Sequence, residues 1–317
     1  MLDPQARALL DMILALGLPP VNMQTVVEAR QNYRLRRTFT QPDPPEVQHV
    51  QDHAIESGTS RITVRQYRPM GSNSVEPLPA LVYLHGGGGV IGDLETHDVL
   101  CRSLCNQSMC VVLSVDYRLA PEHRFPAAYD DALAAFEWAV AQAQALGIDS
   151  SRTAIGGDSA GGNLAAAVCL GLRDRAAQPA FQLLIYPATD MRATAPSHRS
   201  NGQGYLLTSD AIAWFYRHYL AEPADDVDWR ASPLLAASHA NLPPAMVITA
   251  GFDPLRDEGM QYADALSGAG VATEYICFER QIHGFITMGR VLSEANTALG
   301  LCAFALRKEL KREVAPL

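Results

Sequence analysis

The sequence lacks a long apolar segment, an excess of positive charge and a recognisable targeting signal. No run of about 18 apolar residues is present that could span a bilayer, and Asp11 interrupts the amino-terminal apolar region where a secretory signal would lie. The 25 lysines and arginines are outnumbered by 34 acidic residues, which argues against a nucleic-acid-binding surface. We interpret the cluster Arg30, Arg34, Arg36 and Arg37 as a solvated helix face. We therefore expect a soluble, cytoplasmic protein with no nucleic-acid partner and no stable membrane association.

Metal-binding and disulfide patterns are also missing. The six cysteines are Cys101, Cys105, Cys110, Cys169, Cys277 and Cys302. None forms a C-x-x-C motif, and no set of cysteines and histidines has the spacing of a structural zinc site. A chain of 317 residues can also build a hydrophobic core without disulfides. We expect reduced thiols in the core, and neither a metal nor an organic cofactor.

What the sequence does contain is a regular alternation of strand-like and helix-like segments from about residue 61 onward. The central strand candidates are continuous apolar runs, which are typical of parallel strands covered on both faces. The candidates are residues 62–68, 80–84, 111–115, 153–156, 181–186, 246–250 and 273–278. Because amphipathic helix patterns lie between them, we predict an α/β fold with a mostly parallel central sheet and helices on both faces.

Two regions depart from this alternation. Residues 1–48 contain two helix patterns, separated by a Gly-Leu-Pro-Pro segment and ended by a proline-rich one. Residues 189–232 are far longer than the usual connection in an α/β unit, and they contain a helix pattern that begins after a capping Thr208. We expect these two regions to form a helical cap over the carboxyl ends of the strands, with residues 49–188 and 233–317 as the core.

The segment most informative about chemistry is Gly-Asp-Ser-Ala-Gly at residues 157–161. It follows a strand candidate and precedes a helix pattern at residues 163–172, which is the setting of a G-x-S-x-G nucleophile elbow. The glycines permit a sharp turn that exposes the serine hydroxyl. Ser159 is therefore the candidate nucleophile, and it needs a base that is oriented by a third group.

The candidates for the base and the third group follow Ser159 in the order found in α/β-hydrolases, an acid and then a histidine. His283 comes after the last strand candidate, and we assign it as the base. Asp253 directly follows the strand candidate at residues 246–250, and Pro254 would leave it at the cap of the next helix. Asp257 is the alternative acid.

A glycine run, His-Gly-Gly-Gly at residues 85–88, follows another strand candidate. Such a run can form half of an oxyanion hole, in which backbone N–H groups bind the anion of a tetrahedral intermediate. Glycine is needed there because a side chain would block the approach of the backbone. Gly87 and Gly88 are the candidate donors, together with the N–H of Ala160.

The same glycine run supports a rival hypothesis, a dinucleotide-binding oxidoreductase. Residues 87–92 match the pattern G-x-G-x-x-G after a strand candidate, and Asp116 lies at the end of the next one. This hypothesis leaves the elbow, Asp253 and His283 without a role.

Taken together, these segments resemble the bacterial hormone-sensitive-lipase-like (family IV) carboxylesterases of the α/β-hydrolase fold. The motifs are His-Gly-Gly-Gly at 85–88, Asp-Tyr-Arg-Leu-Ala-Pro-Glu at 116–122, Gly-Asp-Ser-Ala-Gly-Gly at 157–162, Asp-Pro-Leu-Arg-Asp-Glu at 253–258 and His-Gly-Phe at 283–285. The resemblance runs from about residue 60 to residue 290 and indicates the Gly-Asp-Ser-Ala-Gly subfamily.

The resemblance implies a serine carboxylesterase that hydrolyses small-molecule esters of short- to medium-chain acids through an acyl-enzyme on Ser159. It implies that Asp253 and His283 complete a catalytic triad, that the glycine run contributes to the oxyanion hole, and that a homodimer is a candidate assembly. It also implies that the segment 116–118 is a buried, ion-paired turn rather than part of the chemistry.

One position departs from the family pattern. Relatives commonly carry an aromatic residue after the three glycines, whereas this chain has Gly89. We therefore predict a pocket with one open wall and tolerance of bulky esters. The expected substrate pocket also includes Asp158 and Tyr205. A third hypothesis is a noncatalytic ligand-binding hydrolase fold, as in plant hormone receptors that resemble this family, but those have lost the catalytic histidine, which is present here as His283.

Overall fold

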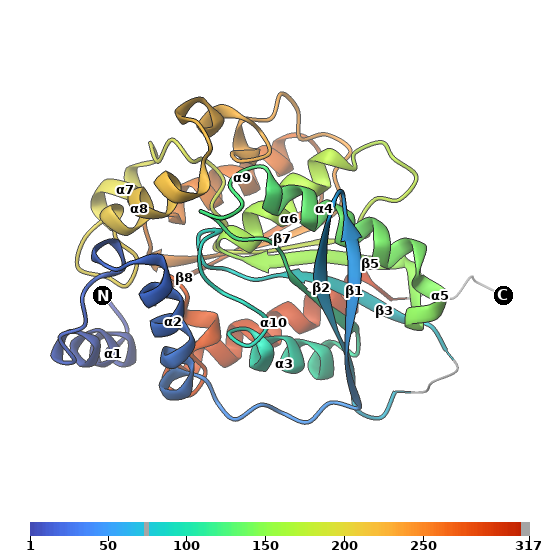
Figure 1. Cartoon of the computed structure of the whole chain (residues 1–317), viewed down its shortest axis with the longest axis horizontal. Helices are drawn as coiled ribbons and strands as arrows, with labels where there is room; N and C mark the ends of the chain where they lie inside the picture. The colour runs from blue at the N-terminus through green and yellow to red at the C-terminus, as the bar shows by residue number, and fades with distance from the viewer. Residues whose placement is uncertain (73–75, 312–317) are drawn as a thin grey trace.

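The computed structural model describes residues 1–72 and 76–311, and its centre is an eight-stranded sheet (Figure 1). The strands are β1 (His49–Ser57), β2 (Ser60–Arg68), β3 (Leu78–Leu84), β4 (Val111–Asp116), β5 (Ile148–Asp158), β6 (Gln182–Ile185), β7 (Ala245–Phe252) and β8 (Thr273–Ile282). Their order across the sheet is β1-β2-β4-β3-β5-β6-β7-β8. β2 is antiparallel to both β1 and β4, and the remaining neighbours are parallel. The predicted α/β fold with a mostly parallel sheet is confirmed.

β1 is a strand that the sequence analysis did not identify. It pairs with β2 through a tight turn at Gly58, whose φ is +57°. It lies at the edge of the sheet, and most of its side chains are exposed or partly exposed. Because an edge strand with solvated faces needs few apolar residues, the hydrophobic pattern of this segment is weak.

Helices cover both faces of the sheet, as expected. α3 (Asp98–Ser108) and α10 (Ser293–Glu309) lie together on one face, whereas α4 (Ala127–Ala141), α6 (Ala160–Gly171) and α9 (Arg256–Gly268) lie on the other (Figure 1). Shorter helices are α5 (Ala143–Leu146), η3 (Pro233–Leu235) and η4 (Phe285–Thr287).

The hydrophobic core forms two layers that use alternate residues of the sheet. From β3, Val82 and Leu84 belong to one buried cluster, and Leu81 and Tyr83 belong to the other. This alternation follows from the two-residue period of a strand. All six cysteines are free, and five of them are buried. None of the helices in residues 1–72 and 76–311 has the length and apolar character needed to cross a membrane.

The two irregular regions come together at one end of the sheet, on the left of Figure 1. The first contains α1 (Pro4–Ala15), η1 (Val21–Met23) and α2 (Val26–Thr40), and the second contains α7 (Pro196–Ser200), α8 (Ser209–Tyr219) and η2 (Pro223–Val227). The side chains of Asp3, Thr25 and Thr208 accept backbone N–H groups at the starts of α1, α2 and α8. Local capping therefore determines where these helices begin.

The arginines of α2 do not form a solvated face, as the sequence analysis expected. Three of them pair with carboxylates of the core: Arg30 with Glu122 at 2.7 Å, Arg34 with Asp93, and Arg37 with Glu95 at 3.8 Å. They recur at i, i+4 and i+7, so they share one face of the helix. This face connects α2 to the core.

Three strands extend beyond the predicted segments, and this determines where the candidate residues lie. β5, β7 and β8 end immediately before Ser159, Asp253 and His283. The carboxyl ends of parallel strands lie at the same edge of a sheet. The three residues therefore meet at that edge, beneath the cap.

Candidate active site

Ser159 lies in a strained turn between β5 and α6. Its backbone has φ +55° and ψ −117°, a conformation that residues other than glycine rarely adopt. Gly161 makes the turn possible, because a Cβ at that position would overlap the carbonyl oxygen of Leu84. α6 begins at Ala160, so the hydroxyl of Ser159 stands at a helix N-terminus, as in a nucleophile elbow.

Ser159, His283 and Asp253 form one hydrogen-bonded chain. Nε2 of His283 lies 3.0 Å from Oγ of Ser159, and Nδ1 lies 2.7 Å from Oδ2 of Asp253. Asp253 is fully buried, and its other carboxylate oxygen accepts the N–H of Leu255 at 2.9 Å. When Nδ1 donates to the carboxylate, Nε2 of the neutral ring is left as an acceptor. This arrangement allows His283 to take the proton of Ser159.

Asp257, the alternative acid, has other partners. Its carboxylate accepts the N–H of Ser197 at 2.9 Å and pairs with Arg256 at 2.7 Å. The carboxylate within hydrogen-bonding distance of His283 is that of Asp253. The expectation that Asp253 also caps the next helix is wrong, because α9 begins only at Arg256.

Two residues that the sequence analysis missed support this chain. The ring of Tyr186 packs against the imidazole of His283, with centroids 4.7 Å apart. The amide of Asn201 donates to the carbonyl oxygens of Gly251 and Asp253, each at 3.1 Å. Tyr186 follows β6 and Asn201 follows α7, and neither position carries a motif that could have indicated its role.

The glycine run after β3 borders the same cavity as Ser159. The N–H groups of Gly87 and Gly88 have no hydrogen-bond acceptor among the residues that the structure describes. The N–H of Ala160 lies in the first turn of α6, where a helix provides no acceptor of its own. Three free donors beside a nucleophile can bind a developing oxyanion.

Asp158 holds the start of the glycine run. Its carboxylate accepts the Tyr83 hydroxyl at 2.7 Å and the Gly86 N–H at 3.0 Å, and it lies 3.2 Å from Nε2 of His97. Burial acts to raise the pKa of Asp158, but His97 and the hydrogen bonds outweigh burial, so the pKa is lowered. Asp158 borders the cavity, but its carboxylate is only 4% exposed. Its place at the pocket is thus as expected, and its contact with substrate stays a prediction.

The segment 116–118 is structural, although not in the way expected. Tyr117 is buried, stacks on His85 with centroids 4.3 Å apart, and donates to its carbonyl oxygen at 2.6 Å. Arg118 pairs with Asp131 at 2.7 Å, whereas Asp116 is exposed. Burial lowers the pKa of His85 to about 4, so this ring is neutral at pH 7. The segment thus supports the strand end that carries the glycine run. Its buried ion pair joins Arg118 to Asp131, outside the segment, and not to Asp116.

Gly89 does not leave an open pocket wall. Its φ is +70°, and a Cβ at this position would lie 2.5 Å from the ring of Tyr219. A Cβ at Gly88 would overlap the ring of Phe215. Both rings belong to α8, so the cap supplies the aromatic wall. The expectation of an open wall is wrong, because only the tertiary structure brings α8 against the glycine run.

The dinucleotide hypothesis is also wrong. In a dinucleotide-binding fold, the last glycine of the motif opens a helix whose N-terminus binds the pyrophosphate. Here α3 begins only at Asp98, well after Gly92. The glycine run instead packs against the cap.

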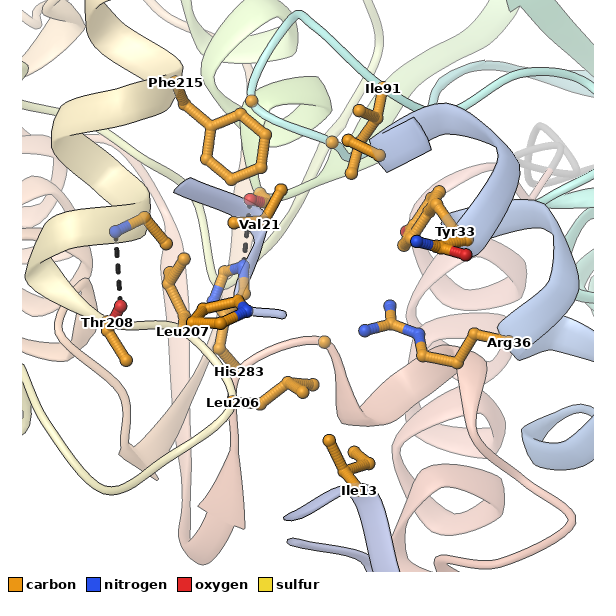
Figure 2. Close-up of a pocket in the computed structure, with 18 of the residues that line it drawn as sticks. Ile13, Val21, Tyr33, Arg36, Ile91, Leu206, Leu207, Thr208, Phe215 and His283 are labelled. Carbon is orange, nitrogen blue, oxygen red and sulfur yellow. Dashed lines mark hydrogen bonds between the residues drawn. The ribbon is translucent and has the colours of Figure 1, made fainter. Parts of the chain in front are cut away.

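A cavity of about 1170 Å³ lies between the cap and the strand ends (Figure 2). Ser159, His283, Gly89 and Tyr205 border it, as expected. Apolar side chains from both irregular regions form much of its wall, among them Ile13, Val21, Leu206, Leu207 and Phe215. Within the described part of the chain, no three histidine, cysteine or acidic side chains are placed to hold a metal ion.

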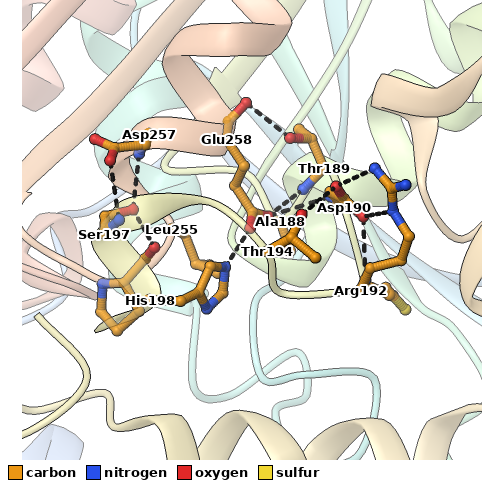
Figure 3. Close-up of polar contacts among 12 residues, drawn as sticks. Ala188, Thr189, Asp190, Arg192, Thr194, Ser197, His198, Leu255, Asp257 and Glu258 are labelled. Atoms are coloured by element: carbon orange, nitrogen blue, oxygen red, sulfur yellow. Dashed lines mark hydrogen bonds and ion pairs between the residues drawn. The ribbon is translucent and has the colours of Figure 1, made fainter. Parts of the chain in front are cut away.

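A buried polar network joins the cap to the segment that carries Asp253 (Figure 3). Glu258 of α9 lies 2.5 Å from Nε2 of His198 of α7, and it accepts the N–H groups of Thr189 at 2.7 Å and Asp190 at 3.3 Å. Burial raises the pKa of Glu258, although His198 opposes this effect. The network therefore anchors α7 against the start of α9.

The fold and the site together define an α/β-hydrolase. The family model described as the alpha/beta hydrolase fold matches residues 81–287. The chain belongs to this family.

Several of its relatives are named as ester hydrolases. Carboxylic ester hydrolase LipN of Mycobacterium tuberculosis is 41% identical over 98% of this chain and 84% of its own length. Ethyl acetate hydrolase of Pseudomonas putida is 44% identical over 78% of this chain and 79% of its own length. The solved structure of an α/β-hydrolase enzyme from the metagenome of Lake Arreo, Spain, is 44% identical with a TM-score of 0.94, over 97% of this chain and 98% of that one. The prediction of a carboxylic ester hydrolase is confirmed at the level of the family.

Proposed function

We propose that this protein is a serine carboxylesterase that hydrolyses esters of short- to medium-chain acids through an acyl-enzyme on Ser159. The observation that carries the proposal is the chain of hydrogen bonds from Asp253 through His283 to Ser159, at the edge of a largely apolar cavity. A nucleophile, a base and a group that orients the base are the parts that acyl transfer requires.

In the first half of the reaction, Oγ of Ser159 attacks the ester carbonyl carbon while Nε2 of His283 takes its proton. The carbon–oxygen bond to the alcohol then breaks, and His283 returns the proton to the leaving alcohol. In the second half, His283 takes a proton from water, which attacks the acyl-enzyme and releases the acid and Ser159. Asp253 keeps the ring in one tautomer and stabilises the imidazolium that forms in each half.

The N–H groups of Gly87, Gly88 and Ala160 would stabilise the oxyanion of each tetrahedral intermediate. Preorganised donors of this kind each contribute about 3–4 kcal/mol to lowering the barrier in comparable sites. The hydrogen bond from the Gly86 N–H to Asp158 supports this role, since it holds the start of the run in place before substrate arrives.

The cap would select the substrate. Residues 1–48 and 189–232 would act as one cap over a core of residues 49–188 and 233–317, and their apolar side chains would enclose the acyl or alcohol group. A cytoplasmic location is part of the proposal, which the six free cysteines support, because oxidising compartments favour disulfides. A homodimer remains a prediction.

The test uses p-nitrophenyl esters from acetate to palmitate and a serine-directed phosphonate. We expect highest kcat/KM for the shorter acyl chains, one phosphonate adduct per chain on Ser159, and a loss of about 10⁴- to 10⁶-fold in kcat for Ser159→Ala. Ser238→Ala, at an exposed serine, is the matched control and should retain the wild-type rate. An adduct on another residue, or a Ser159→Ala variant with near-normal activity, would refute the proposal.

A further inference from the structure

Among the acidic and basic side chains that line the cavity, all but one pair an acid with a base. They are Arg7, Asp11, Arg36, Asp158 and His283. Most have a counter-charge or an ionisable partner: Arg7 faces Asp11 at 3.8 Å, Asp158 faces His97 at 3.2 Å, and His283 faces Asp253 at 2.7 Å. Arg36 forms no ion pair with any residue that the structure describes, and its guanidinium lies over the ring of Tyr33. Among the described residues that line the cavity, Arg36 is therefore the arginine without a carboxylate partner.

Arg36 belongs to the face of α2 that lines the cavity. Ala29, Tyr33, Arg36 and Thr40 recur at i, i+4, i+7 and i+11, and all four border the cavity. The arginines that pair with the core each lie one position further along the chain, so they occupy a different face. Figure 2 shows the guanidinium of Arg36 pointing into the cavity, toward the side on which His283 lies.

Tyr33 orients this guanidinium without neutralising it. Cζ of Arg36 lies 4.7 Å from the centroid of the Tyr33 ring. Burial raises the pKa of Tyr33 to about 12, so the phenol is uncharged at pH 7. Contact with one ring engages only part of a guanidinium, which carries five N–H donors along its edge. Donors along the edge of Arg36 thus remain available to a ligand.

We infer that Arg36 binds a carboxylate at the far end of the substrate, so that the preferred substrates are esters that carry a second, ionised carboxyl group. An unpaired charge in a largely apolar cavity is unfavourable, and a planar carboxylate can accept two parallel N–H bonds from a guanidinium. One carboxylate balances one guanidinium, whereas a doubly charged phosphate would need a further cation, and Arg7, the other arginine among the described lining residues, already faces Asp11. The inference rests on the proposed esterase function and specifies its substrate class.

Two pairs of esters test the inference, one for each side of the scissile bond. Monoethyl adipate and ethyl hexanoate have acyl chains of equal length and differ in a terminal carboxylate or methyl group. 5-Acetoxypentanoate and pentyl acetate make the same comparison on the alcohol side. The readout is the ratio of kcat/KM for the charged ester to kcat/KM for its neutral partner, measured in the wild type, Arg36→Gln, Arg36→Lys and Arg37→Gln. Arg37→Gln is the matched control, because it removes the same charge from the core-facing side of the same helix.

We expect the ratio for at least one pair to fall about 10- to 100-fold in Arg36→Gln, which is the range for a charged hydrogen bond. Arg36→Lys should retain part of the ratio, because lysine keeps the charge but not the planar fork. Arg37→Gln should leave the ratio unchanged, and added salt should raise KM for the charged ester in the wild type more than for the neutral one. The pair that responds shows which side of the ester Arg36 contacts.

The inference is overturned if the ratios for both pairs are the same in Arg36→Gln and the wild type, or if Arg37→Gln lowers them equally. In either case the neutral esters would still be hydrolysed, and the esterase proposal would stand. Failure of the wild type to hydrolyse any of the four esters would instead count against the proposed function itself.

Discussion

The catalytic edge of the sheet and the cap above it are held together by different interactions. At the catalytic edge, Asp158, Asp253 and Glu258 are 3%, 0% and 0% exposed, and each accepts more than one hydrogen bond. In the cap, large apolar side chains of α1, η1 and α2 are exposed, including Leu14 at 81% and Met23 at 74%, and both of these border the cavity. The face of α2 toward the core is attached by partly exposed ion pairs.

This difference suits the two regions to different roles, catalysis at the edge of the sheet and selection of the substrate by the cap. Buried hydrogen bonds in a low-dielectric interior have strict geometry, whereas exposed ion pairs contribute little to stability and are screened by salt. We therefore expect the core to determine the catalytic distances, and the cap to determine which esters reach Ser159. The following substitutions test this comparison.

The largest effect is expected for Asp253→Asn. Loss of the carboxylate leaves His283 in an uncertain tautomer and its imidazolium without support, which should lower kcat by up to about 10⁴-fold. Asp257→Asn is the matched control at the alternative acid, whose partners are Ser197 and Arg256, and it should cost much less. Initial rates on p-nitrophenyl butyrate, with circular dichroism to verify folding, provide the measurement. A folded Asp257→Asn enzyme that is the weaker of the two would reverse the assignment of the acid.

Glu258→Gln should mainly lower stability, because it weakens the buried network between α7 and α9. We expect a loss of about 3 kcal/mol in the free energy of unfolding, measured by urea denaturation. Asp43→Asn, which changes a fully exposed partner of Arg290, should change this free energy very little. Equal effects of the two substitutions would contradict the distinction between buried and exposed pairs.

The cost of Glu258→Gln should also depend on pH. Burial raises the pKa of Glu258 in the folded state above its value in the unfolded chain. Its contribution to stability is therefore fully present below the unfolded pKa and is lost as pH rises through the folded pKa. The difference in unfolding free energy between wild type and Glu258→Gln should be larger at pH 5 than at pH 8, and the opposite trend would show that His198 keeps the carboxylate ionised.

Gly89→Ala tests the contact between the core and α8. The substitution places a Cβ against Tyr219 and also forces alanine into a left-handed conformation, so we expect a loss of about 2–3 kcal/mol in unfolding free energy. Gly270→Ala measures the cost of the left-handed backbone alone, because Gly270 has φ +82° and open space around its Cβ position. If the two variants are equally stable, then Tyr219 does not close this wall of the cavity.

The smallest effect is expected for Arg34→Gln, which removes one ion pair between α2 and the core. The loss in unfolding free energy should be about 0.2–1 kcal/mol and should diminish in high salt. KM should rise while kcat stays near the wild-type value, because the catalytic distances depend on the core. Arg61→Gln, which removes an exposed ion pair between β1 and β2, should change neither parameter. A large fall in kcat for Arg34→Gln would mean that the cap contributes to the catalytic geometry.

Much of the fold could be predicted, because strand and helix periods are properties of neighbouring residues. The buried strands β3, β4 and β7 have continuous apolar runs, and α8 has both its hydrophobic period and a capping Thr208. β1 could not be predicted in the same way, because an edge strand is only partly buried. The predicted start of the helix at Pro254 is wrong, since Asp253 and Leu255 are joined by a hydrogen bond in a turn that precedes α9.

The residues of the candidate site differ in the same way: some could be selected from local sequence, and others could not. Ser159, Asp253 and His283 could be selected because each directly follows a strand and lies in a recognisable motif. Arg36 could have been distinguished from its neighbours by the helical spacing of Ala29, Tyr33 and Thr40, but that spacing alone does not show what the face contacts. The wall at Gly89 could not be predicted, because the ring that closes it comes from a distant segment.

By itself, the sequence determined the alternation of strands and helices, the strained elbow at Ser159 and the order of the candidate acid and base, because these depend on hydrogen bonds and steric limits within a few residues. Only the tertiary structure decided which ring packs against Gly89 and which arginine of α2 faces the cavity. Those outcomes depend on how the two cap regions pack against the strand ends, and packing between segments far apart in the chain is set by complementary shape and charge rather than by local pattern.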